Sequence, residues 1–463
     1  FAHTVYRFGH SMLTDTVDRL ENNLTTVNGD AEQIGLIEAF LNPQAFTASS
    51  GGTLSDADAA SAIIRGMSRQ VGNEIDEFVV EALRNNLVGL PLDLPAINIA
   101  RGRETGIPTL NHARTELYAM TGHVDVKPYT SWLDFAQHIK NPISIVNFIA
   151  AYGTHDLIEG EATLAGKRAA AMAIVLGVAQ DVPANPDMVP PVLAHTINPP
   201  PDRLDFLNAT GLHAGGELGG LNQVDMWIGG LAEEINEFGG MLGSTFNFVF
   251  EYQMEHLQNG DRFYYLSRTQ GMNFLNQLEP NTFADIIMRN TNLGDLHATH
   301  LSAEIMEVPD MILELDTLVA QEDYNGAAAG IDPTHDDFFQ QMIDPKVVRI
   351  NGTSDIDGNG FMDGNVLRFS GGEHVVLGGT EGNDRMFGDK GIDTLWGDGG
   401  DDYLNPGMES DQVFGGEGDD IIEDPFGDDF LRGEAGNDVV VNGSGLDLLF
   451  GGTDNDYIMG VTD

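Results

Sequence analysis

Nine aspartates recur at an interval of nine residues near the C-terminal end of the sequence, and a large aliphatic residue follows each by two positions. The aspartates are Asp384, Asp393, Asp402, Asp411, Asp420, Asp429, Asp438, Asp447 and Asp456. The aliphatic residues are Met386, Leu395, Leu404, Val413, Ile422, Leu431, Val440, Leu449 and Ile458. Glycine stands two positions before most of these aspartates, and it tolerates the positive φ of a tight turn. The double period predicts a solenoid in which each short strand contributes one inward-facing aliphatic side chain.

This period resembles the repeats-in-toxin nonapeptide G-G-x-G-x-D-x-U-x, which coils into a parallel β-roll that holds Ca²⁺ between its turns. Residues 373–463 contain 23 Asp and Glu against 3 Lys and Arg, a net charge of −20. So dense a field opposes compaction unless cations bind, and calcium binding by the nine aspartates is therefore expected to accompany folding. The alternative, a disordered acidic tail, would have no reason to keep an aliphatic residue at every ninth position.

Two turns of the repeat region depart from the glycine pattern. Pro406 with Glu409, and Asp424 with Pro425, stand where glycines are expected. Because these residues lack the conformational freedom of glycine, the sequence predicts that both turns bind Ca²⁺ weakly or not at all.

Composition narrows the classes of partner. The chain has 463 residues, no cysteine and a formal net charge of −50. This charge argues against nucleic acid or an anionic membrane as partner and favours divalent cations. The sequence contains no transmembrane run, and the lack of cysteine together with calcium repeats is typical of bacterial secreted proteins, which meet millimolar Ca²⁺ outside the cell. The start at Phe1, without a signal-peptide pattern, predicts a piece of a longer polypeptide.

Hydrophobic spacing divides the chain into three predicted domains. Residues 1–310 are expected to be mainly helical, with helices over 1–20, 59–86 and 242–257 and a surface insertion over 165–220. Residues 311–370 are expected to form a linking region with strands at 347–350 and 366–369. Residues 371–463 form the predicted β-roll. The predicted fold class is therefore multidomain, with a mainly α-helical domain followed by a parallel β-roll.

The linking region contains the opening of an EF-hand-like loop. Oxygen-bearing side chains alternate at Asp355, Asp357 and Asn359, a glycine allows the bend, and Asp363 stands at position 9. Position 12 is Val366 rather than glutamate, so a helix-loop-helix hand is not expected. These four side chains are predicted to bind calcium in a stand-alone loop, and the alternative is an acidic turn.

The N-terminal segment places Arg7 and His10 three residues apart on one helix face, with Gly9 beside the histidine. Gly9 would allow a flat ligand to approach the backbone, while His10 ligates a metal and Arg7 pairs with a carboxylate of the same ligand. Taken alone, this pattern is weak, since a single histidine on a helix is more often packed or solvated.

Three further segments reinforce the pattern. Arg7-Phe8-Gly9-His10 resembles the proximal-histidine helix of the animal-type haem peroxidases, also called the peroxidase–cyclooxygenase superfamily. The segments 92–108 (LDLPAINIARGRETGIP), 225–233 (DMWIGGLAE) and 259–265 (NGDRFYY) resemble three blocks of the same family, in the same order. The resemblance spans roughly 260 residues, and four ordered motifs make it specific.

The resemblance implies a role for each matching residue. His10 would ligate the iron of haem b, which is either free or covalently attached, and Asn98 would accept a hydrogen bond from the other ring nitrogen. Arg7 and Arg101 would hold the haem propionates. Asp225 with Trp227, or Asp261 with Arg262, would form buried structural pairs. Glu104-Thr105 departs from the Asp-His of the family, which leaves the role of that pair in doubt.

In this family the distal histidine and the distal arginine lie upstream of the proximal helix, and only nine residues precede His10. The chain is therefore expected to carry the proximal side of the haem alone, with no catalytic residue of the distal side, and to be inactive by itself. Either a missing N-terminal half belongs to the same protein, or activity has been lost.

Other histidines are alternatives to His10. His3 lies seven residues earlier on the same predicted face and would compete for iron, although the motif favours His10. His297 and His300 could chelate a metal, but no third ligand is evident, and a surface pair is the preferred interpretation.

The sequence thus predicts a secreted bacterial haem peroxidase that uses H₂O₂ to oxidise a halide, a phenol or Mn²⁺, with a calcium β-roll suited to type I export. The alternative is a calcium-binding surface or matrix protein in which the peroxidase fold is a non-catalytic scaffold.

Overall fold

The computed structural model describes residues 1–21, 33–49, 52–85, 87, 90–235, 240–264, 281–291, 293, 300–305, 308–316, 321–323, 346–356 and 358–460. The chain forms two compact units, each discontinuous in sequence. The helical unit comprises Phe1–Asp15 and Gly72–Arg268. The roll unit comprises Thr16–Val71 and Thr269–Asp463.

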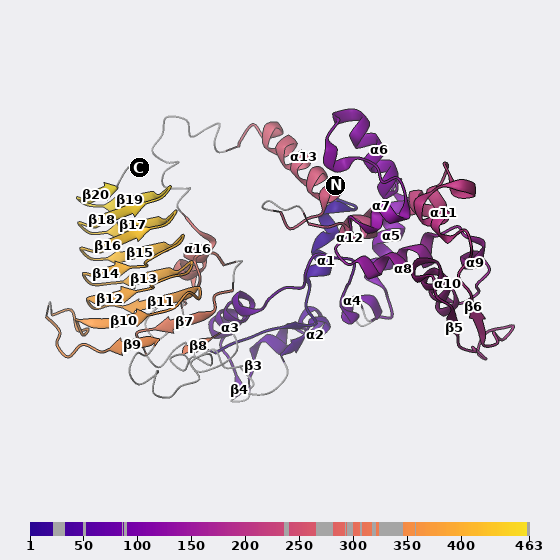
Figure 1. The fold of residues 1–463 in the computed structure, drawn as a ribbon. Helices are drawn as coiled ribbons and strands as arrows, with labels where there is room; N and C mark the ends of the chain where they lie inside the picture. The colour runs from indigo at the N-terminus through magenta and orange to yellow at the C-terminus, as the bar shows by residue number, and fades with distance from the viewer. Residues whose placement is uncertain are drawn as a thin grey trace. The chain divides into compact units, whose positions relative to one another are not determined.

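Short helices make up most of the helical unit (Figure 1). The unit also contains a small antiparallel hairpin of β5 (Gln180–Val182) and β6 (His195–Ile197). The helices are η1 (Val5–Phe8), α1 (Gly9–Met12), α4 (Glu81–Asn85), α5 (Leu94–Glu104), α6 (Leu110–Thr121), η4 (Val124–Val126), α7 (Trp132–Ala136), η5 (Pro142–Ser144), α8 (Ile145–Tyr152), α9 (Asp156–Glu159), α10 (Leu164–Leu176), α11 (Arg203–Asn208), η6 (Gly211–His213), η7 (Leu218–Gln223), α12 (Met226–Ala232) and α13 (Ser244–Gly260).

The core of this unit lies where α8 and α10 pack side by side (Figure 1). Alanines line the buried face of α10, so the two helices can approach closely, and Trp132, Phe135 and Phe206 fill the surrounding space with no exposed surface. The Trp132 indole N–H donates to the carbonyl of Gly219, so the large ring is buried without an unsatisfied donor. One face of α10 thus belongs to the core, although Leu164 and Leu176 at its ends are exposed, and the predicted surface insertion is wrong for this helix.

Two of the predicted long helices are shorter in the structure. The helix expected over 1–20 ends at Met12, and Thr16–Val17 forms strand β1 against β2 (Ile34–Gly35). The helix expected over 59–86 divides into α3 (Asp56–Arg69) and α4, because Gln70 turns to extended backbone before Gly72. The apolar spacing in both cases continues through residues that cap or leave the helix. The helix expected over 242–257 is confirmed as α13.

Two mainly parallel sheets form the β-roll. Their strand orders are β20-β18-β16-β14-β12-β10-β9 and β19-β17-β15-β13-β11-β7-β8 (Figure 1). From β10 onward successive strands alternate between the sheets, whereas β9 and β8 pair antiparallel with β10 and β7. Paired residues in neighbouring strands differ by 18, as in Leu395↔Val413, so one coil contains two nonapeptides. The strands are β7 (Met311–Glu314), β8 (Gln321–Asp323), β9 (Val347–Ile350), β10 (Asn365–Phe369), β11 (Val375–Thr380), β12 (Asp384–Phe387), β13 (Thr394–Asp398), β14 (Tyr403–Asn405), β15 (Gln412–Glu417), β16 (Ile421–Phe426), β17 (Phe430–Ala435), β18 (Val439–Ser444), β19 (Leu448–Thr453) and β20 (Tyr457–Gly460).

The predicted aliphatic column forms the core between the sheets. From Met386 to Val440 every member of the column is fully buried, Leu449 is partly buried, and Ile458 on the last strand is 44% exposed. The core extends upstream through Leu313 and Leu367, which belong to strands that precede the repeats. The strands expected at 347–350 and 366–369 are confirmed, and the fold class is confirmed as a helical domain followed by a parallel β-roll. The three-domain boundaries stay a prediction.

A second apolar cluster joins the N-terminal segment of the roll unit to one outer face of the roll. Leu20 and Ile64 pack against a group that includes Trp396 and Phe414, whose rings stack with centroids 3.9 Å apart. Ile64 lies on α3 and is followed by Arg69, which donates to the carbonyl of Pro309. Helix α16 (Phe283–Asn290) joins the same cluster through Ala284. The remaining elements of this segment are α2 (Leu36–Leu41), η2 (Pro43–Thr47), β3 (Ala48–Ser49) and β4 (Gly52–Thr53).

Truncation in the aliphatic column should destabilise the roll. Leu404 is fully buried, so Leu404→Ala in saturating calcium is expected to cost about 2–5 kcal/mol of unfolding free energy. Leu446 is 84% exposed, and Leu446→Ala should change it by less than about 0.5 kcal/mol. Urea unfolding followed by circular dichroism measures both, and equal effects of the two substitutions would contradict the burial pattern.

Candidate functional site

The structure brings His10 and Asn98 together, although 88 residues separate them in sequence. His10 Nδ1 lies 2.8 Å from Asn98 Nδ2. His10 is half-buried on α1, and Asn98 is fully buried on α5. The Asp93 carboxylate accepts from the N–H of Ala96 and so caps α5, whose first turn contains a proline. A well-defined helix start therefore fixes the position from which Asn98 reaches the histidine.

The orientation of the Asn98 amide differs from the expected one. Its Oδ1 accepts a hydrogen bond of 2.8 Å from Arg7 Nη1, and its Nδ2 faces His10. Since an amide nitrogen can only donate, His10 Nδ1 acts as the acceptor, and a neutral ring then carries its proton on Nε2. Sequence analysis predicts the reverse, with Asn98 accepting from Nδ1–H. The difference arises because Arg7 occupies the amide oxygen.

The surroundings of His10 fit a metal ligand on a flat group. Burial, and then the charge of Arg7, lower the pKa of His10, which favours the neutral imidazole that metals require. In the described part of the chain Nε2 has no hydrogen-bond partner, and a Cβ added at Gly9 would meet no atom within 4 Å. The donor set and the open backbone at Gly9 would therefore suit a histidine that binds the iron of a haem, once the ring proton has left Nε2. His3 is exposed.

The remaining member of the predicted haem set, Arg101, lies near the C-terminal end of α5. Arg101 is exposed, as propionate binding at a surface would allow. Arg103, two residues on, pairs with Asp225 through Nε at 2.8 Å and Nη2 at 2.5 Å. The Tyr152 hydroxyl donates to the same carboxylate at 2.8 Å. Asp225 therefore ties α5, α8 and α12 together. Glu104 is exposed.

Two structural pairs were predicted, and the structure distinguishes them. Asp225 and Trp227 are buried as predicted, and the Trp227 indole N–H lies 3.4 Å from the carbonyl of Arg7, behind the histidine segment. Asp261 and Arg262 are exposed, so their predicted burial is wrong. Asp261 Oδ1 instead accepts from the N–H of Phe263, which closes a local turn after α13.

In the roll, the repeat aspartates link neighbouring coils through one carboxylate oxygen. Asp402 Oδ1 accepts from the backbone N–H of Asp384 at 2.8 Å, and the same bond recurs one coil further at each step. The recurring bonds run from Asp393 N to Asp411 Oδ1, Asp402 N to Asp420 Oδ1, Asp411 N to Asp429 Oδ1, Asp420 N to Asp438 Oδ1, Asp429 N to Asp447 Oδ1 and Asp438 N to Asp456 Oδ1. One oxygen of each carboxylate is thus used by the fold itself.

Among the described residues, the other oxygen is buried without a hydrogen-bond partner at six of the nine repeat positions. These oxygens are Oδ2 of Asp393, Asp402, Asp411, Asp420, Asp429 and Asp438. A Cβ at Gly397, five residues before Asp402, would lie only 2.4 Å from its Oδ2, so glycine keeps the space beside the carboxylate open. A buried anionic oxygen without a partner is costly, and a cation with oxygen ligands would satisfy it.

Asp384 differs from the other buried members. Its Oδ1 accepts from the Asn365 amide at 2.6 Å, and its Oδ2 accepts from the Thr380 N–H at 2.7 Å. Its carboxylate is therefore already satisfied by protein donors at the first coil of the repeat. Asp447 and Asp456, at the opposite end, are only partly buried. The strongest observations for calcium thus concern the six central aspartates.

Burial shifts the titration of these carboxyl groups upwards. Desolvation and then neighbouring carboxylates raise the pKa of Asp402 to about 11. Burial likewise raises the pKa of Asp411 to about 9, of Asp393 and Asp420 to about 8, and of Asp384 to about 7. Without a cation, several of these groups would be protonated at neutral pH, and calcium has to displace those protons.

The EF-hand-like loop has the local hydrogen bonds of a calcium loop. The Asp355 carboxylate accepts from the N–H groups of Gly358 and Gly360, and Asn359 Oδ1 accepts from Phe361 N–H. Asp363 is buried, and its oxygens accept from two backbone N–H groups. Asp357 lies outside the described residues. Calcium binding by this loop stays a prediction.

The chain matches two known protein-family models. A family model described as animal haem peroxidase matches residues 1–163 and 219–301, which together make up more than half of the chain. The chain belongs to the animal haem peroxidase family. A model of the RTX calcium-binding nonapeptide repeat matches residues 378–413, 414–449 and 443–460. The unmatched residues 164–218 coincide with the predicted insertion, which begins with the core helix α10.

Relatives of this peroxidase-family chain are distant and longer. Peroxinectin A from Dictyostelium discoideum is 24% identical over 300 residues, covering 64% of this chain and 39% of its own length. A peroxidasin homolog from Caenorhabditis briggsae is 23% identical over 266 residues, covering 57% and 14%. The solved structure of peroxidase A from Dictyostelium discoideum matches with 22% identity and a TM-score of 0.40, covering 66% of this chain and 42% of that one. The chain thus spans about two fifths or less of these relatives.

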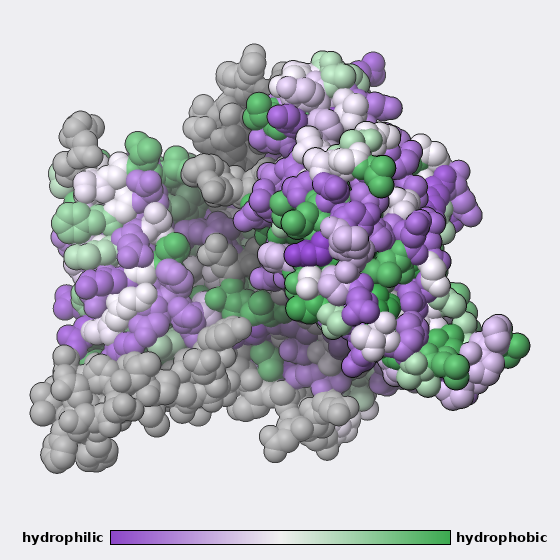
Figure 2. Space-filling model, turned by 45° about the vertical axis from the view of Figure 1, so that its right-hand side comes forward, coloured by the Kyte–Doolittle hydropathy of each residue, from purple (hydrophilic) through white to green (hydrophobic). Residues whose placement is uncertain are grey.

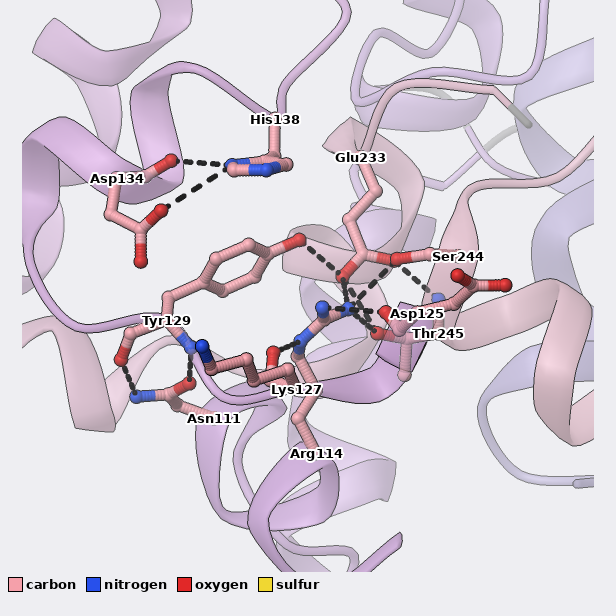
Figure 3. Close-up of polar contacts among 10 residues, drawn as sticks. All are labelled: Asn111, Arg114, Asp125, Lys127, Tyr129, Asp134, His138, Glu233, Ser244 and Thr245. Carbon is pink, nitrogen blue, oxygen red and sulfur yellow. Dashed lines mark hydrogen bonds and ion pairs between the residues drawn. The ribbon is translucent and has the colours of Figure 1, made fainter. Parts of the chain in front are cut away.

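Sequence reasoning missed a buried polar network in the peroxidase-family domain (Figure 3). Arg114 Nη1 donates at 2.8 Å to Glu233 Oε1, and the Tyr129 hydroxyl donates to the same oxygen at 3.0 Å. Thr245, at the start of α13, donates to Glu233 through its N–H at 2.7 Å and through its hydroxyl at 2.6 Å. The Glu233 carboxylate therefore joins α6, α12 and α13. Glu233 ends the third motif, which marks this residue but does not indicate its partners.

A pocket of about 640 Å³ opens beside this network, next to Arg114, Tyr129 and His138. Its lining residues do not include His10 or Asn98. The Arg114 guanidinium covers the Tyr129 ring at 4.2 Å, and the pKa of Tyr129 is raised, chiefly by burial and then by Glu233. The polar groups at the pocket wall are therefore already engaged in contacts with one another. We assign the network to stabilising the fold rather than to peroxidase chemistry.

A cluster of His155, Asp202 and His213 has the residue types of a metal site. Its hydrogen bonds indicate a different role. His155 Nδ1 accepts from the N–H of Leu157, so its proton lies on Nε2, which faces Asp202 Oδ1 at 3.3 Å. His213 Nε2 lies 3.0 Å from the other oxygen. Each imidazole thus contacts one oxygen of the Asp202 carboxylate. Both lower the pKa of Asp202, and His213 is the larger cause.

The predicted surface pair at His297 and His300 is wrong for His300, and His297 lies outside the described residues. His300 is buried between Glu314, 2.9 Å from Nδ1, and Asp398, 3.1 Å from Nε2. Burial lowers the pKa of His300, but Asp398 and Glu314 outweigh it and hold the pKa well above its usual value. A charged histidine therefore pairs with carboxylates of β7 and β13 inside the roll unit.

Among the described residues, the helices all lack the combination of length and apolar composition that crossing a bilayer requires. Hydrophilic residues cover much of the surface in Figure 2, with apolar ones in small groups.

Removing the Arg114 side chain should lower the free energy of unfolding of the peroxidase-family domain. Arg114→Ala leaves Glu233 buried without its cation and is expected to cost about 3–5 kcal/mol. Arg84 forms an exposed pair with Glu81, so Arg84→Ala should cost less than about 1 kcal/mol. Urea unfolding followed by tryptophan fluorescence compares them, and equal costs would refute the structural role.

Calcium affinity should rise with pH. In the metal-free roll the raised pKa values mean that stability is greatest below about pH 4 and is lost as pH rises through 7 to 9. Calcium binds the deprotonated form, so each displaced proton should strengthen apparent affinity about tenfold per pH unit between pH 6 and pH 8. Calorimetric titration in buffers of different ionisation enthalpy measures the protons released, and an affinity independent of pH would contradict the burial argument.

Proposed function

We propose that the chain supplies the proximal side of the haem in an extracellular, calcium-dependent peroxidase. The observation that carries this proposal is the contact between His10, Asn98 and Arg7. These three residues come from two motifs about 90 residues apart, and a scaffold without haem would need none of them in combination. Membership of the animal haem peroxidase family supports the same assignment.

The residues of the proximal site would divide the work as follows. His10 would bind iron through Nε2, Asn98 would fix the orientation of the ring, and Arg7 with Arg101 would pair with carboxylates at the haem edge. The haem would supply the redox chemistry, which reduces peroxide and withdraws electrons from a second substrate. The chain's own contribution would therefore be to hold the group and to set the basicity of the histidine that binds it.

Haem binding would require the Asn98 amide to turn over. Iron needs the lone pair of His10 Nε2, so the ring proton has to move to Nδ1 and donate to an oxygen. Rotation of the amide by half a turn presents Oδ1 to His10 and its NH₂ group to Arg7. The Asn98 NH₂ group and the Arg7 guanidinium, which are both donors, then face each other. Arg7 would therefore lose its acceptor and turn toward a carboxylate at the haem edge. Loading of the site and recruitment of Arg7 would thus be coupled.

The oxidised substrate would be a halide, a phenol or Mn²⁺, with H₂O₂ as the oxidant. A net charge of −50 favours cations near the protein, which supports Mn²⁺ among the three. The roll would stay unfolded during a type I export step at low calcium and would fold outside the cell. The calcium repeats and the absence of cysteine support an extracellular location.

The second candidate is a calcium-built surface or matrix protein in which the peroxidase fold has no catalytic role. The observation that favours it is the orientation of the Asn98 amide, which donates to His10 Nδ1 and so leaves the ring proton on Nε2, the atom that would have to bind iron. The two candidates differ in a single property, namely whether the protein takes up haem.

A spectrum of the native, unproteolysed protein with added haem tests the proposal. A Soret band is expected, and His10→Ala should abolish it, whereas His3→Ala should leave it unchanged. Asn98→Leu removes the partner of Nδ1 and should weaken haem affinity by about 10–100-fold. No band in the wild-type protein would favour the scaffold, and a band that survives His10→Ala would refute the assignment of the axial ligand.

A further inference from the structure

The repeat aspartates line two different edges of the roll, because each coil contains two nonapeptides. Bonds between residues 18 apart connect the members of one edge to one another. The aspartates of edge A are Asp384, Asp402, Asp420, Asp438 and Asp456. Those of edge B are Asp393, Asp411, Asp429 and Asp447. The edges therefore alternate along the sequence and can differ in chemistry.

They differ at the position five residues before each aspartate. On edge A this position is always glycine, at Gly379, Gly397, Gly415, Gly433 and Gly451. On edge B it changes along the roll, from Gly388 to Pro406, Asp424 and Asn442. Asp424 and Asn442 are register partners on the adjacent strands β16 and β18. The glycine pattern is thus broken on one edge only, and two neighbouring coils have side-chain oxygens there.

This position faces the unpartnered oxygen of the following aspartate. On edge A a Cβ would lie 2.3 Å from Asp420 Oδ2 at Gly415, and 2.1 Å from Asp438 Oδ2 at Gly433. A side chain placed there on edge B therefore reaches the carboxylate rather than solvent. Asp424 is only 1% exposed, and its carboxylate oxygen lies within 4.8 Å of ligand atoms of both Asp411 and Asp429.

Each member of this trio has one oxygen that the fold uses and one that it does not. Oδ1 of Asp411, Asp424 and Asp429 accepts from a backbone N–H at 2.7, 3.3 and 3.0 Å respectively. Oδ2 of all three is buried without a partner in the described part of the chain, and none of the three residues is more than 3% exposed. Three buried carboxylates at this separation repel one another strongly unless they are protonated or a cation lies between them.

We propose that Asp411, Asp424 and Asp429 form a three-carboxylate calcium site that binds more tightly than the edge A sites. The inference rests on the calcium-binding function proposed for the roll and reverses the expectation that the Asp424 turn is impaired. At edge A the glycine leaves one carboxylate per turn, whereas here Asp424 adds another and raises the negative charge around the ion. Calcium affinity rises with the number of charged ligands. Asn442, whose buried Oδ1 is also unpartnered, extends the same edge with a neutral oxygen.

A tight site at this place would set the order in which the roll forms. Asp411 and Asp429 flank β15 and β16 in the middle of the repeat region, so the first ion bound would join coils that have neighbours on both sides. Repeat proteins fold by nucleation and propagation to adjacent repeats. Calcium at a concentration too low for the edge A sites would then order these central coils first.

Calcium titration of the full chain, with stoichiometry from native mass spectrometry, tests this site. The wild-type protein should show one ion that binds at least tenfold more tightly than the rest. Asp424→Asn, which removes a charge, and Asp424→Gly, which restores the glycine of edge A, should each abolish that tight class and leave the weaker ones unchanged. Glu423→Gln removes one exposed charge next to the site and should change nothing.

The outcomes separate this inference from the proposed function. If the wild-type chain takes up calcium but Asp424→Gly binds every ion as well as before, the three-carboxylate site is wrong and the calcium function stands. If the wild-type chain takes up no calcium at all, both fail. Circular dichroism in saturating calcium shows whether the variants keep the roll. Tb³⁺ luminescence provides an independent readout, since a trivalent ion should occupy the trio first.

Discussion

Buried carboxylates with one unused oxygen each govern how the roll unit can exist. The aspartates that join the coils through Oδ1 also hold an anionic Oδ2 out of water, at Asp402 and Asp420 among others. Either protons or cations can neutralise this buried charge. Protonation removes the negative charge of the carboxylate, whereas a bound cation leaves the carboxylate ionised at the pH of most extracellular fluids. The aliphatic column between the sheets is adequate as a core, but it cannot by itself offset several uncompensated buried charges.

The proximal site depends on a different kind of constraint. Asn98 is fully buried and has one amide oxygen, for which Arg7 and a protonated His10 Nδ1 would compete. The oxygen faces Arg7 while the NH₂ group faces His10, so one orientation of the amide cannot present the oxygen to both, and the hydrogen bonds of the site change with the proton position of the imidazole. Behind it, Trp227 and the Arg103–Asp225 pair fix the backbone of both motifs. The rigid parts of the site are therefore the structural pairs, and the adaptable part is a single amide.

Features that repeat strictly along the sequence were predicted well. Helix ends and contacts between residues distant in sequence were predicted less well. The members of the column from Met386 to Val440 were assigned correctly, because a nine-residue period with two faces allows one burial pattern, whereas Ile458 on the last strand is exposed. The helix expected over 1–20 failed, since apolar spacing does not reveal where extended backbone begins after Met12. The Arg114–Glu233 network and the burial of His300 involve partners 119 and 14 residues apart, which no local pattern indicates.

Segment 16–71 belongs to the roll unit, although it lies within the first stretch that the family model matches. Its residues Leu20 and Ile64 pack against Trp396 and Phe414, more than 300 residues later in the chain. During synthesis, this early segment therefore emerges long before the surface that buries it. Its apolar side chains need protection from aggregation until the last coils are made and have met calcium. A protease that cut near residue 370 would likewise leave the early segment without its apolar partners.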